Sequence, residues 1–408
     1  MADVSGVNVS HSEGLENIPK KYGTLIAISL FFAPYTALRV FQIGVSELSI
    51  LLLFGLALFS KRIRVFLTFG ERFVFTRFWL LFFLFAFLGF AYNHFFMNPP
   101  SGSLSSTVFD LAAYLLIFVC CISLESLFGQ AYAQFDFDRL FKSFYTFSSI
   151  ALFLLFVISR VRGSLLGFPL NFFGAFRPFA TNIHHVSMFV APLPFLGLKC
   201  AADSKHWHTK VLFVSFVISN IVIGINTRST KVVMAFYLGF FVYLISETLL
   251  SRQLRPFRRV LLLLLITVAL LLSMVFWTSI FGQASSFFEQ EDLSGTRSVI
   301  YRGSLEKSLI SPIFGFGPGA HAVGVGGSFN DAHQTLLTAL LQGGVFGVIV
   351  YSALMLRILI KCTNDPCILG AFFSILLYSL GGDIMRRLPM WLFLVLFYYY
   401  CEQKSHEE

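Results

Sequence analysis

The sequence predicts an all-α polytopic membrane protein, a helical bundle with about 12 transmembrane spans. Three observations predict this class. Hydrophobic residues make up 56% of the 408 positions and charged residues only 12%, whereas soluble domains contain about 25% charged residues. Apolar stretches long enough to cross about 30 Å of hydrocarbon recur along the whole chain. No segment alternates with the period of a β-barrel strand, so the stretches are expected to be helices, whose backbone amides need no partner from lipid.

These stretches divide the chain into five parts. The first residues are polar and acidic and lack the features of a cleavable signal peptide, so 1–21 are expected to stay in the cytoplasm. Spans one to nine are expected within 22–281, a large outer loop with short helices at 282–332, spans ten to twelve within 333–401, and a cytoplasmic tail at 402–408. The predicted spans are 22–41, 45–60, 74–97, 108–127, 140–159, 183–201, 209–226, 230–250, 259–281, 333–358, 367–382 and 388–401.

Basic residues set the predicted orientation, because cytoplasmic loops carry an excess of lysine and arginine. The formal net charge of +9 is therefore interpreted as a topology signal. Nucleic-acid binding is excluded, because no long basic run is interleaved with aromatic residues. The basic residues expected on the inner side are Lys61, Arg62, Arg64, Arg72, Arg77, Lys199, Lys205, Lys210, Arg252, Arg255, Arg258, Arg259, Arg357 and Lys361.

The cysteines and the motif content argue against disulfides, metals and cofactors. With this topology all six cysteines lie in the membrane or on the cytoplasmic side, so no external disulfide framework is expected. No HExxH, Walker A or EF-hand pattern is present, and a metal-dependent mechanism has no support in the sequence. The cysteines are Cys120, Cys121, Cys200, Cys362, Cys367 and Cys401.

A set of basic residues falls on the predicted outer face, where topology disfavours them. Any single member is explained equally well as a solvated residue or as a side chain that reaches lipid phosphate. For the whole set, a site for an anionic ligand is the better explanation, because arginine forks match phosphate oxygens. The set comprises Arg160, Arg162, Arg177, Arg228, Lys231, Arg297, Arg302, Lys307, Arg386 and Arg387.

Two segments concentrate these residues. Arg228 lies in the polar turn GINTRSTK between two spans, where the alternative role is an interfacial anchor. Arg297 and Arg302 lie in a predicted short helix of the outer loop, which Ser294 or Thr296 can cap and which ends at Ser311-Pro312. The glycine-rich stretch that follows, GFGPG, is interpreted as a turn. An apolar face for packing on the membrane surface is expected from Val299, Ile300, Leu305 and Leu309.

Histidines provide the candidates for proton transfer. His333 is expected where the outer loop enters span ten, and its ordinary pKa near 6.5 allows it to accept a proton at about pH 7. Asp331 either orients its imidazole or caps the helix, and the alternative for His333 is a hydrogen bond to water. His184 and His185 head span six and are candidate lining residues. Downstream, Gly343, Gly344 and Gly347 allow a neighbouring helix to approach closely.

The ordered motifs TRS, SGTRSVIYRGSLEKSLISPIFGFGPG and AHQTLLTALLQGGVFGVIVY resemble the O-antigen ligase/polymerase family. The resemblance is concentrated in about 220–352 and implies a GT-C-like membrane glycosyltransferase. Family members usually have asparagine after the histidine and often tryptophan in the loop helix, where this chain has Gln334 and Tyr301.

The resemblance implies a metal-independent, inverting transfer of a glycan from undecaprenyl diphosphate to a sugar hydroxyl of lipid A–core. It places the site on the periplasmic face of the bacterial inner membrane. The catalytic residues carried over are Arg228, Arg297 and His333, with Arg302 as an alternative to Arg297. The other residues predicted to bind the diphosphate or glycan are Arg177, Lys231, His184, His185, Asp331 and Arg386.

Other functions remain open from the sequence. A polymerase would join the glycan to a second lipid-linked repeat, and the sequence barely separates it from a ligase. A transporter or flippase for the same lipid would have ionisable residues deep within spans, whereas the charges here gather at the outer ends. A receptor or purely structural membrane protein is the remaining alternative.

Overall fold

The computed structural model describes residues 13–40, 43–59, 73–96, 104–131, 135–181, 183–250, 296–323, 329–330 and 332–407. Within them the helices are α1 (Glu13–Phe32), α2 (Val45–Phe59), α3 (Val74–Phe96), α4 (Leu104–Ala131), α5 (Phe137–Val161), α6 (Ile183–Val190), α7 (Leu193–Ala202), α8 (Trp207–Asn226), α9 (Thr230–Leu250), α11 (Thr296–Ser308), α12 (Thr335–Cys362), α13 (Pro366–Gly381) and α14 (Leu388–Glu407). Short strands pair as antiparallel hairpins: β1 (Arg39–Val40) with β2 (Ile43–Gly44), β3 (Ser164–Leu165) with β4 (Phe168–Pro169), β5 (Asn171–Phe172) with β6 (Ala175–Phe176), and β7 (Ala322–Val323) with β8 (Phe329–Asn330).

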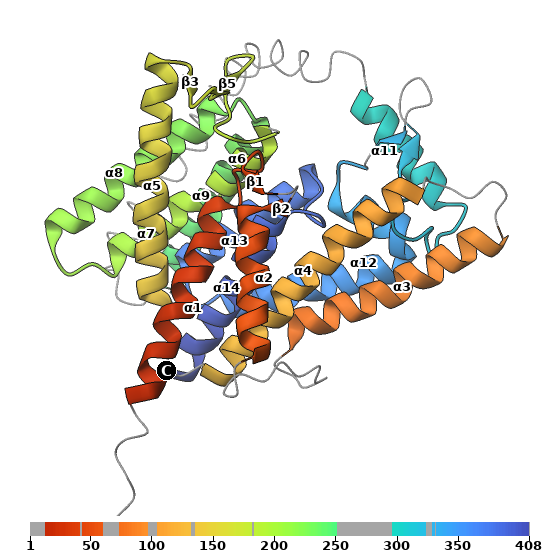
Figure 1. Ribbon diagram of the computed structural model, residues 1–408, viewed down its shortest axis with the longest axis horizontal. Helices are drawn as coiled ribbons and strands as arrows, with labels where there is room; N and C mark the ends of the chain where they lie inside the picture. The colour runs from red at the N-terminus through yellow and green to blue at the C-terminus, as the bar shows by residue number, and fades with distance from the viewer. Residues whose placement is uncertain are drawn as a thin grey trace, which may run out of the picture.

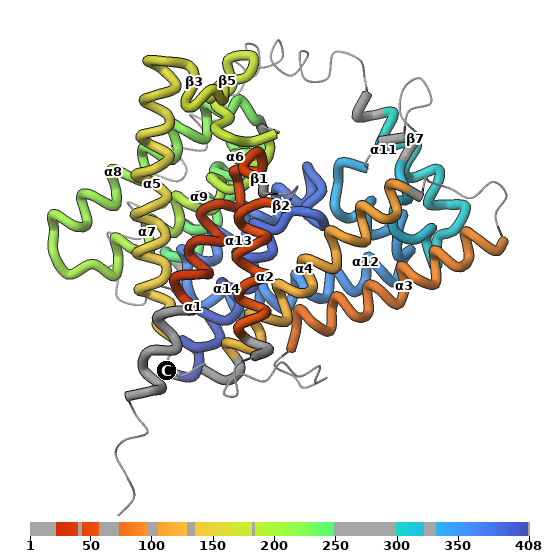
Figure 2. The backbone as a smooth tube through the Cα atoms, in the orientation of Figure 1, coloured from red at the N-terminus to blue at the C-terminus, as the bar shows by residue number. Residues whose placement is uncertain are grey.

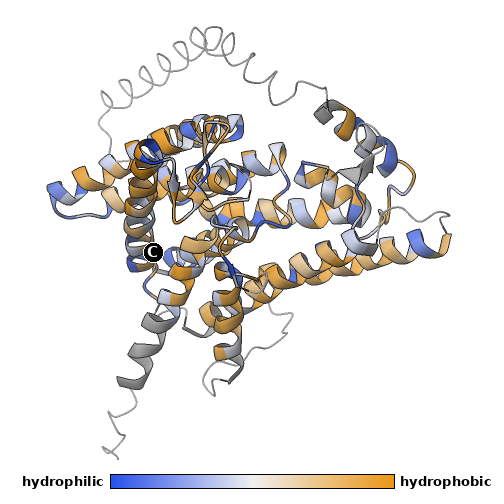
Figure 3. Cartoon of the chain, turned by 45° about the horizontal axis from the view of Figure 1, so that its top comes forward, coloured by the Kyte–Doolittle hydropathy of each residue, from blue (hydrophilic) through white to orange (hydrophobic). Residues whose placement is uncertain are grey.

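The predicted all-α membrane class is confirmed. Seven helical segments of the described residues are long and apolar enough to cross a membrane, and three shorter apolar helices accompany them. Hydrophobic residues cover the long helices along most of their length (Figure 3). Every predicted span except 259–281 overlaps a described helix, and 259–281 lies outside the described residues.

Prolines account for two differences from the predicted spans. α1 begins at Glu13 and ends at Phe32, well before 41, because Pro34 follows and disfavours helical backbone. The chain then turns through β1 and β2 and returns along α2, beside α1 (Figure 2). The predicted span 183–201 is two helices, α6 and α7, with Pro192 at the break. A proline within a helix removes a backbone donor and clashes with the preceding turn.

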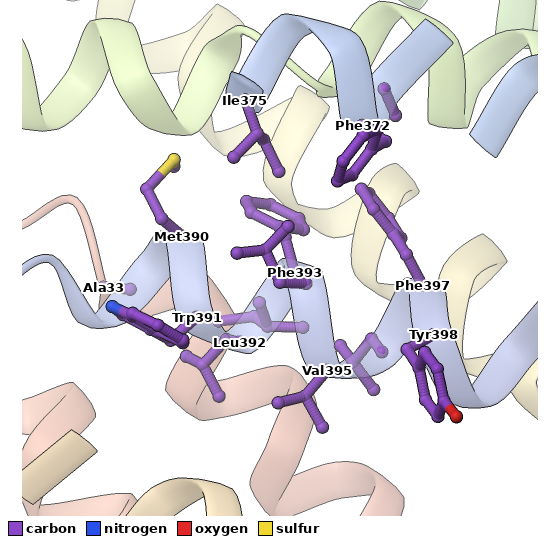
Figure 4. Close-up of a cluster of buried hydrophobic side chains, with 14 of the residues drawn as sticks. Ala33, Phe372, Ile375, Met390, Trp391, Leu392, Phe393, Val395, Phe397 and Tyr398 are labelled. Atoms are coloured by element: carbon purple, nitrogen blue, oxygen red, sulfur yellow. The ribbon is translucent and has the colours of Figure 1, made fainter. Parts of the chain in front are cut away.

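The core of the bundle is built around α14, although this helix is not among the long apolar segments. Its last turns carry charged residues, whereas residues 390–401 are buried almost completely. Phe393 and Phe397 of α14 face Phe372 and Ile375 of α13 (Figure 4). Trp391 packs in the same core and its indole N–H donates to the carbonyl of residue 384 at 3.0 Å.

A buried carboxylate joins three helices. Glu125 of α4 accepts hydrogen bonds from the backbone amides of Phe75 and Thr76, both at 2.8 Å, and from the Thr76 hydroxyl at 2.5 Å. The Tyr399 hydroxyl of α14 donates to it at 3.3 Å. The first amides of a helix have no partner within the helix. Glu125 therefore caps α3 from a neighbouring helix and stabilises the α3–α4–α14 junction.

The ends of the helices form two groups. At what we call the C-terminal end, Lys199 pairs with Asp365 at 3.0 Å, and Lys404 lies 3.8 Å from Asp138 at the start of α5. What we call the hairpin end contains β3–β6 at the other end of α5, and it lies opposite the C-terminus in Figure 1. α5 has 25 residues, or about 37 Å of helix, enough to cross a bilayer core of about 30 Å.

Replacing Glu125 tests the three-helix junction. Glu125→Ala leaves two buried amides of α3 without an acceptor, so it should destabilise the fold by about 3 kcal/mol. The thermal midpoint of the purified protein in detergent measures this. Glu306→Ala, at an exposed glutamate of α11, is the control and should change the midpoint little. Equal midpoints for the two variants would contradict the capping role.

Candidate active site

A break in α12 positions the glycine-rich turn of the loop. At Gly344 the backbone adopts φ 60° and ψ −159°, a conformation essentially restricted to glycine. The break releases backbone carbonyls from the helical ladder. The Leu341 carbonyl accepts from the Phe316 amide at 2.7 Å, and the Gln342 carbonyl accepts from the Gly317 amide at 3.0 Å.

The glycine-rich turn predicted at 315–319 therefore packs inside the bundle. Residues 315–320 are all buried. Beyond the break, the Val345 amide donates to the Pro312 carbonyl at 2.8 Å. A Cβ on Gly89 of α3 would lie 2.3 Å from the Phe314 carbonyl oxygen, so α3 touches the turn backbone directly. Because protein acceptors bind these amides, the turn anchors the loop to α12.

A buried polar network secures the same turn. One carboxylate oxygen of Asp110, in α4, accepts a hydrogen bond from the Arg386 guanidinium at 2.7 Å. Its other oxygen accepts the Gly319 amide at 3.0 Å and the Gln342 side-chain amide at 2.9 Å. The Tyr114 hydroxyl donates to Gln342 Oε1 at 2.6 Å. The network thus joins α4, α12, the glycine turn and the segment before α14.

Arg386 was predicted to bind substrate, and the structure gives it an internal partner. Its side chain is 11% exposed, Asp110 is 1% exposed, and Asp383 lies 3.8 Å away on the other side. Removing one partner of a buried ion pair leaves the other charge buried and uncompensated. Through its pair with Asp110, Arg386 therefore contributes to the fold at this position. Its contact with substrate stays a prediction.

α11 confirms the predicted loop helix, although it ends at Ser308 and turns precede Ser311-Pro312. One face packs on the protein through Ile300, Ser304 and Ser308, all buried. Small serines permit this close approach, and each hydroxyl is satisfied by the carbonyl four residues earlier, at 2.7 Å. Of the predicted apolar face only Ile300 is buried. The exposed fractions of the others are 43% for Val299, 51% for Leu305 and 70% for Leu309.

Lys307 fastens α11 to the chain beyond the glycine turn. Its amine donates to the His321 carbonyl at 2.5 Å and lies 5.6 Å from the centre of the Phe316 ring. Burial lowers the pKa of Lys307 from 10.5 to about 8. This predicted outer cation therefore has a structural contact within the loop.

The structure describes the side chain of one loop arginine but not that of the other. Arg302 is 82% exposed and forms an i,i+4 ion pair with Glu306 at 2.7 Å. Arg297 lies in the first turn of α11, but its side chain is outside the described part, as are Ser294 and Asp331. The choice between Arg297 and Arg302 therefore stays a prediction.

Arg228 occupies a strained turn between α8 and α9. Its φ is 54°, unusual for a residue with a side chain. The guanidinium donates to the Phe173 carbonyl at 3.1 Å in the β5–β6 turn. It also covers Gly174, where a Cβ would lie 2.9 Å from the guanidinium carbon. The side chain is exposed, so the hairpin positions an accessible cation.

Hydroxyl groups tie the Arg228 turn to two other helices. Ser229, directly after Arg228, forms a hydrogen bond of 3.0 Å with the Tyr378 hydroxyl of α13. Tyr378 in turn donates to Ser187 of α6. Because all three hydroxyl-bearing residues are buried, this chain fixes the turn against α6 and α13.

Lys231 and Thr335 approach the same short segment at the end of α13. A Cβ on Gly382 would lie 3.4 Å from the Lys231 amine. The Gly382 carbonyl accepts from the Thr335 hydroxyl at 2.9 Å, and the Ile384 amide donates to that hydroxyl at 3.0 Å. His333, two residues before Thr335, is exposed and has a φ of 53°. The Arg228–Lys231 turn and the His333 turn are thus joined through Gly382.

The remaining predicted residues lie around α6. His185 forms hydrogen bonds with Arg387 and Thr36, and His184 precedes it in the first turn of the helix. Arg177 stacks over the Phe172 ring at 4.1 Å from its centre. At the end of α5, Arg160 donates to Asn226 of α8, and the structure brings both helix ends together.

Sequence reasoning missed Asp110 and Gln342. One signal for Asp110 was available, because an acidic residue within an apolar stretch requires an internal partner. No comparable signal marked Gln342, whose role depends on the helix break beside it. Arg39, which also lies near His185, was missed because it fell within a predicted span.

The fold and these turns define a multi-pass membrane protein with a group of cationic side chains at its hairpin end. Residues 213–352 match the family model described as O-antigen ligase. The match contains Arg228, Lys231, Arg297, Arg302 and His333. It supports the resemblance predicted from the motifs over these residues, which make up less than half of the chain. The family supports glycosyl transfer of the ligase or related polymerase type in general. A comparison with curated proteins gave no match.

Two adjacent glycines test the break in α12. A Cβ at Gly344 would lie 2.0 Å from the Ile313 carbonyl oxygen, whereas at Gly343 the nearest atom is 3.5 Å away in the Phe82 ring. Gly344→Ala should therefore destabilise the fold by more than about 2 kcal/mol. Gly343→Ala should be tolerated. Thermal midpoints in detergent measure both, and equal midpoints would show that the break is not required.

Proposed function

We propose that this protein is an O-antigen ligase. It transfers a glycan from undecaprenyl diphosphate to a sugar hydroxyl of lipid A–core, without a metal ion or other cofactor. Its partners are the lipid-linked donor, the lipid A–core acceptor and the surrounding membrane lipids. The enzyme lies in the bacterial inner membrane, and its site faces the periplasm.

One observation carries this proposal. Arg228 and His333 occupy left-handed backbone conformations at two turns joined through Gly382, and both fall within the family match. Strained backbone at a non-glycine residue persists only where surrounding structure enforces it, and it is concentrated at functional sites. The β5–β6 hairpin and the α13 end provide that enforcement here.

The chemistry needs charge stabilisation more than covalent catalysis. A glycosyl diphosphate already has a good leaving group, whose developing charge Arg228, Arg297 and Lys231 would neutralise. His333 in its neutral form would accept the proton of the acceptor hydroxyl. Attack opposite the diphosphate would invert the anomeric centre. Arg302, Arg177, His184, His185, Asp331 and Arg386 are proposed to contact the diphosphate or the glycan.

The second candidate is a polymerase, which the family match favours equally because it covers related polymerases. A deletion strain separates the two. Loss of a ligase leaves long lipid-linked chains unattached, whereas loss of a polymerase leaves single repeats attached to core. In vitro transfer with lipid A–core or a second lipid-linked repeat as acceptor gives the same distinction.

The proposal predicts the effect of three substitutions on transfer by purified protein in detergent. Arg228→Ala and Arg297→Ala should each lower the rate by about 10²–10³-fold, since they remove stabilisation of the leaving group. His333→Ala should lower it by about 10²–10⁴-fold through loss of the base.

Matched controls lie at the C-terminal end of the bundle. Arg139 and His208 are exposed there, so Arg139→Ala and His208→Ala should retain the full rate. Normal transfer by the Arg228, Arg297 and His333 variants at equal protein levels would rule out the mechanism.

A further inference from the structure

His185 lies at a junction of basic side chains from distant parts of the chain. Arg387, Arg39 and Arg177 are the arginines whose charges act on its imidazole. Arg387 directly precedes α14, Arg39 begins β1, and Arg177 directly follows β6. Three separate segments therefore bring positive charge to one place.

Two hydrogen bonds define the state of the His185 ring. Arg387 Nη1 lies 2.5 Å from Nε2, and the Thr36 hydroxyl lies 2.8 Å from Nδ1. A guanidinium only donates, so Nε2 accepts and carries no proton. The ring proton is then on Nδ1 and is donated to Thr36. His185 is thus a neutral imidazole that orients the Arg387 guanidinium.

The other two arginines are held by neutral groups. Arg39 Nε donates to the Thr36 carbonyl at 2.8 Å, and Arg177 Nη1 donates to the Thr181 carbonyl at 2.9 Å. Each guanidinium has five N–H donors, and neither carbonyl neutralises its charge. Stacking on the Phe172 ring covers a face of Arg177 and leaves its edge for acceptors in the guanidinium plane.

The backbone around these arginines is pre-organised. The Thr36 and Thr181 hydroxyls are 3.0 Å apart, and the Thr181 amide donates to the Thr36 hydroxyl at 3.1 Å. The Ala37 amide donates to the Phe179 carbonyl at 2.8 Å. The α1–β1 connection and the segment after β6 therefore form one frame, which lowers the entropy cost of binding a ligand.

We propose that Arg39, Arg177 and Arg387 form a binding site for a phosphate group, with His185 as the neutral side chain that orients Arg387. Guanidinium groups bind phosphate oxygens bidentately, and an anion relieves the repulsion among converging cations. The phosphate comes either from a phosphorylated substrate or from the headgroup of an anionic lipid.

This site shares the β5–β6 hairpin with the Arg228 turn. Arg228 contacts the turn of the hairpin, whereas Arg177 contacts the Phe172 ring. A role for the phosphate site in glycan transfer rests on the proposed function. Phosphate binding itself does not.

Inorganic phosphate is the first probe. The thermal midpoint of the purified chain in a neutral detergent is followed against phosphate concentration, with chloride keeping the ionic strength constant. The midpoint should rise saturably. Arg39→Gln, at an exposed side chain, and Arg387→Gln should raise the half-saturating concentration at least tenfold. Arg387→Lys, which retains the positive charge, replaces Arg387→Gln if that variant does not fold. Arg139→Gln is the matched control.

Nanodiscs of phosphatidylglycerol or phosphatidylcholine provide the second probe and identify the source. Stabilisation by phosphatidylglycerol alone, lost in Arg39→Gln, would assign the phosphate to a lipid headgroup. Stabilisation by inorganic phosphate would assign it to a soluble or substrate group. An equal response of the native chain and Arg39→Gln, or no response to either probe, would overturn the site.

A further variant separates this inference from the proposed function. If Arg228→Ala abolishes the phosphate response while Arg39→Gln retains it, phosphate binds at the Arg228 turn, and the new site is wrong while the ligase proposal stands. If the native chain shows the response, lost in Arg39→Gln, but transfers no glycan, the ligase proposal fails and the site stands.

Discussion

The break in α12 at Gly344 is the constraint on which the site depends. A helix interrupted within a bilayer exposes backbone groups that lipid cannot satisfy. The amides of Phe316 and Gly317 supply the missing donors, so the glycine turn has to lie inside the bundle. That position fixes α11, which directly precedes the turn, against the α12 segment that begins just after His333. These two backbone hydrogen bonds therefore help to position the backbone of α11 beside the start of α12.

A second set of contacts joins the two strained turns. The end of α13 meets Lys231 on one side and Thr335 on the other, while Tyr378 links Ser229 to α6. Side chains that bind a diphosphate must keep fixed positions while charge develops on the leaving group. The connection of the turns from α8–α9, α12 and α13–α14 would meet this requirement for the proposed diphosphate site.

Sequence reasoning predicted what hydropathy and local chemistry determine. Helix class and the loop helix at α11 followed from apolar length and capping residues, and Arg228 and His333 were selected as candidates from polar turns beside spans. The break at Gly344 could not be predicted, because glycine is common in membrane helices and only the docked turn makes its left-handed φ necessary. Asp110 was missed within the predicted span 108–127, since its partners Arg386 and Gln342 are distant in sequence. The face of α11 that packs on the protein was not predicted, because serines pack there through their small size, and the apolar face expected at the membrane surface stays a prediction.

The proposed glycan transfer requires that the hairpin end face outward. Of the basic residues predicted inside, Lys199 and Lys361 form ion pairs at the C-terminal end, whereas Arg228 and Arg177 lie at the other. Cysteine labelling tests this directly, because the six native cysteines are buried. In intact cells, a maleimide that cannot cross the inner membrane should label Arg302→Cys, and it should label Lys205→Cys only after that membrane is permeabilised. Labelling of Lys205→Cys in intact cells, with Arg302→Cys protected, would contradict the account.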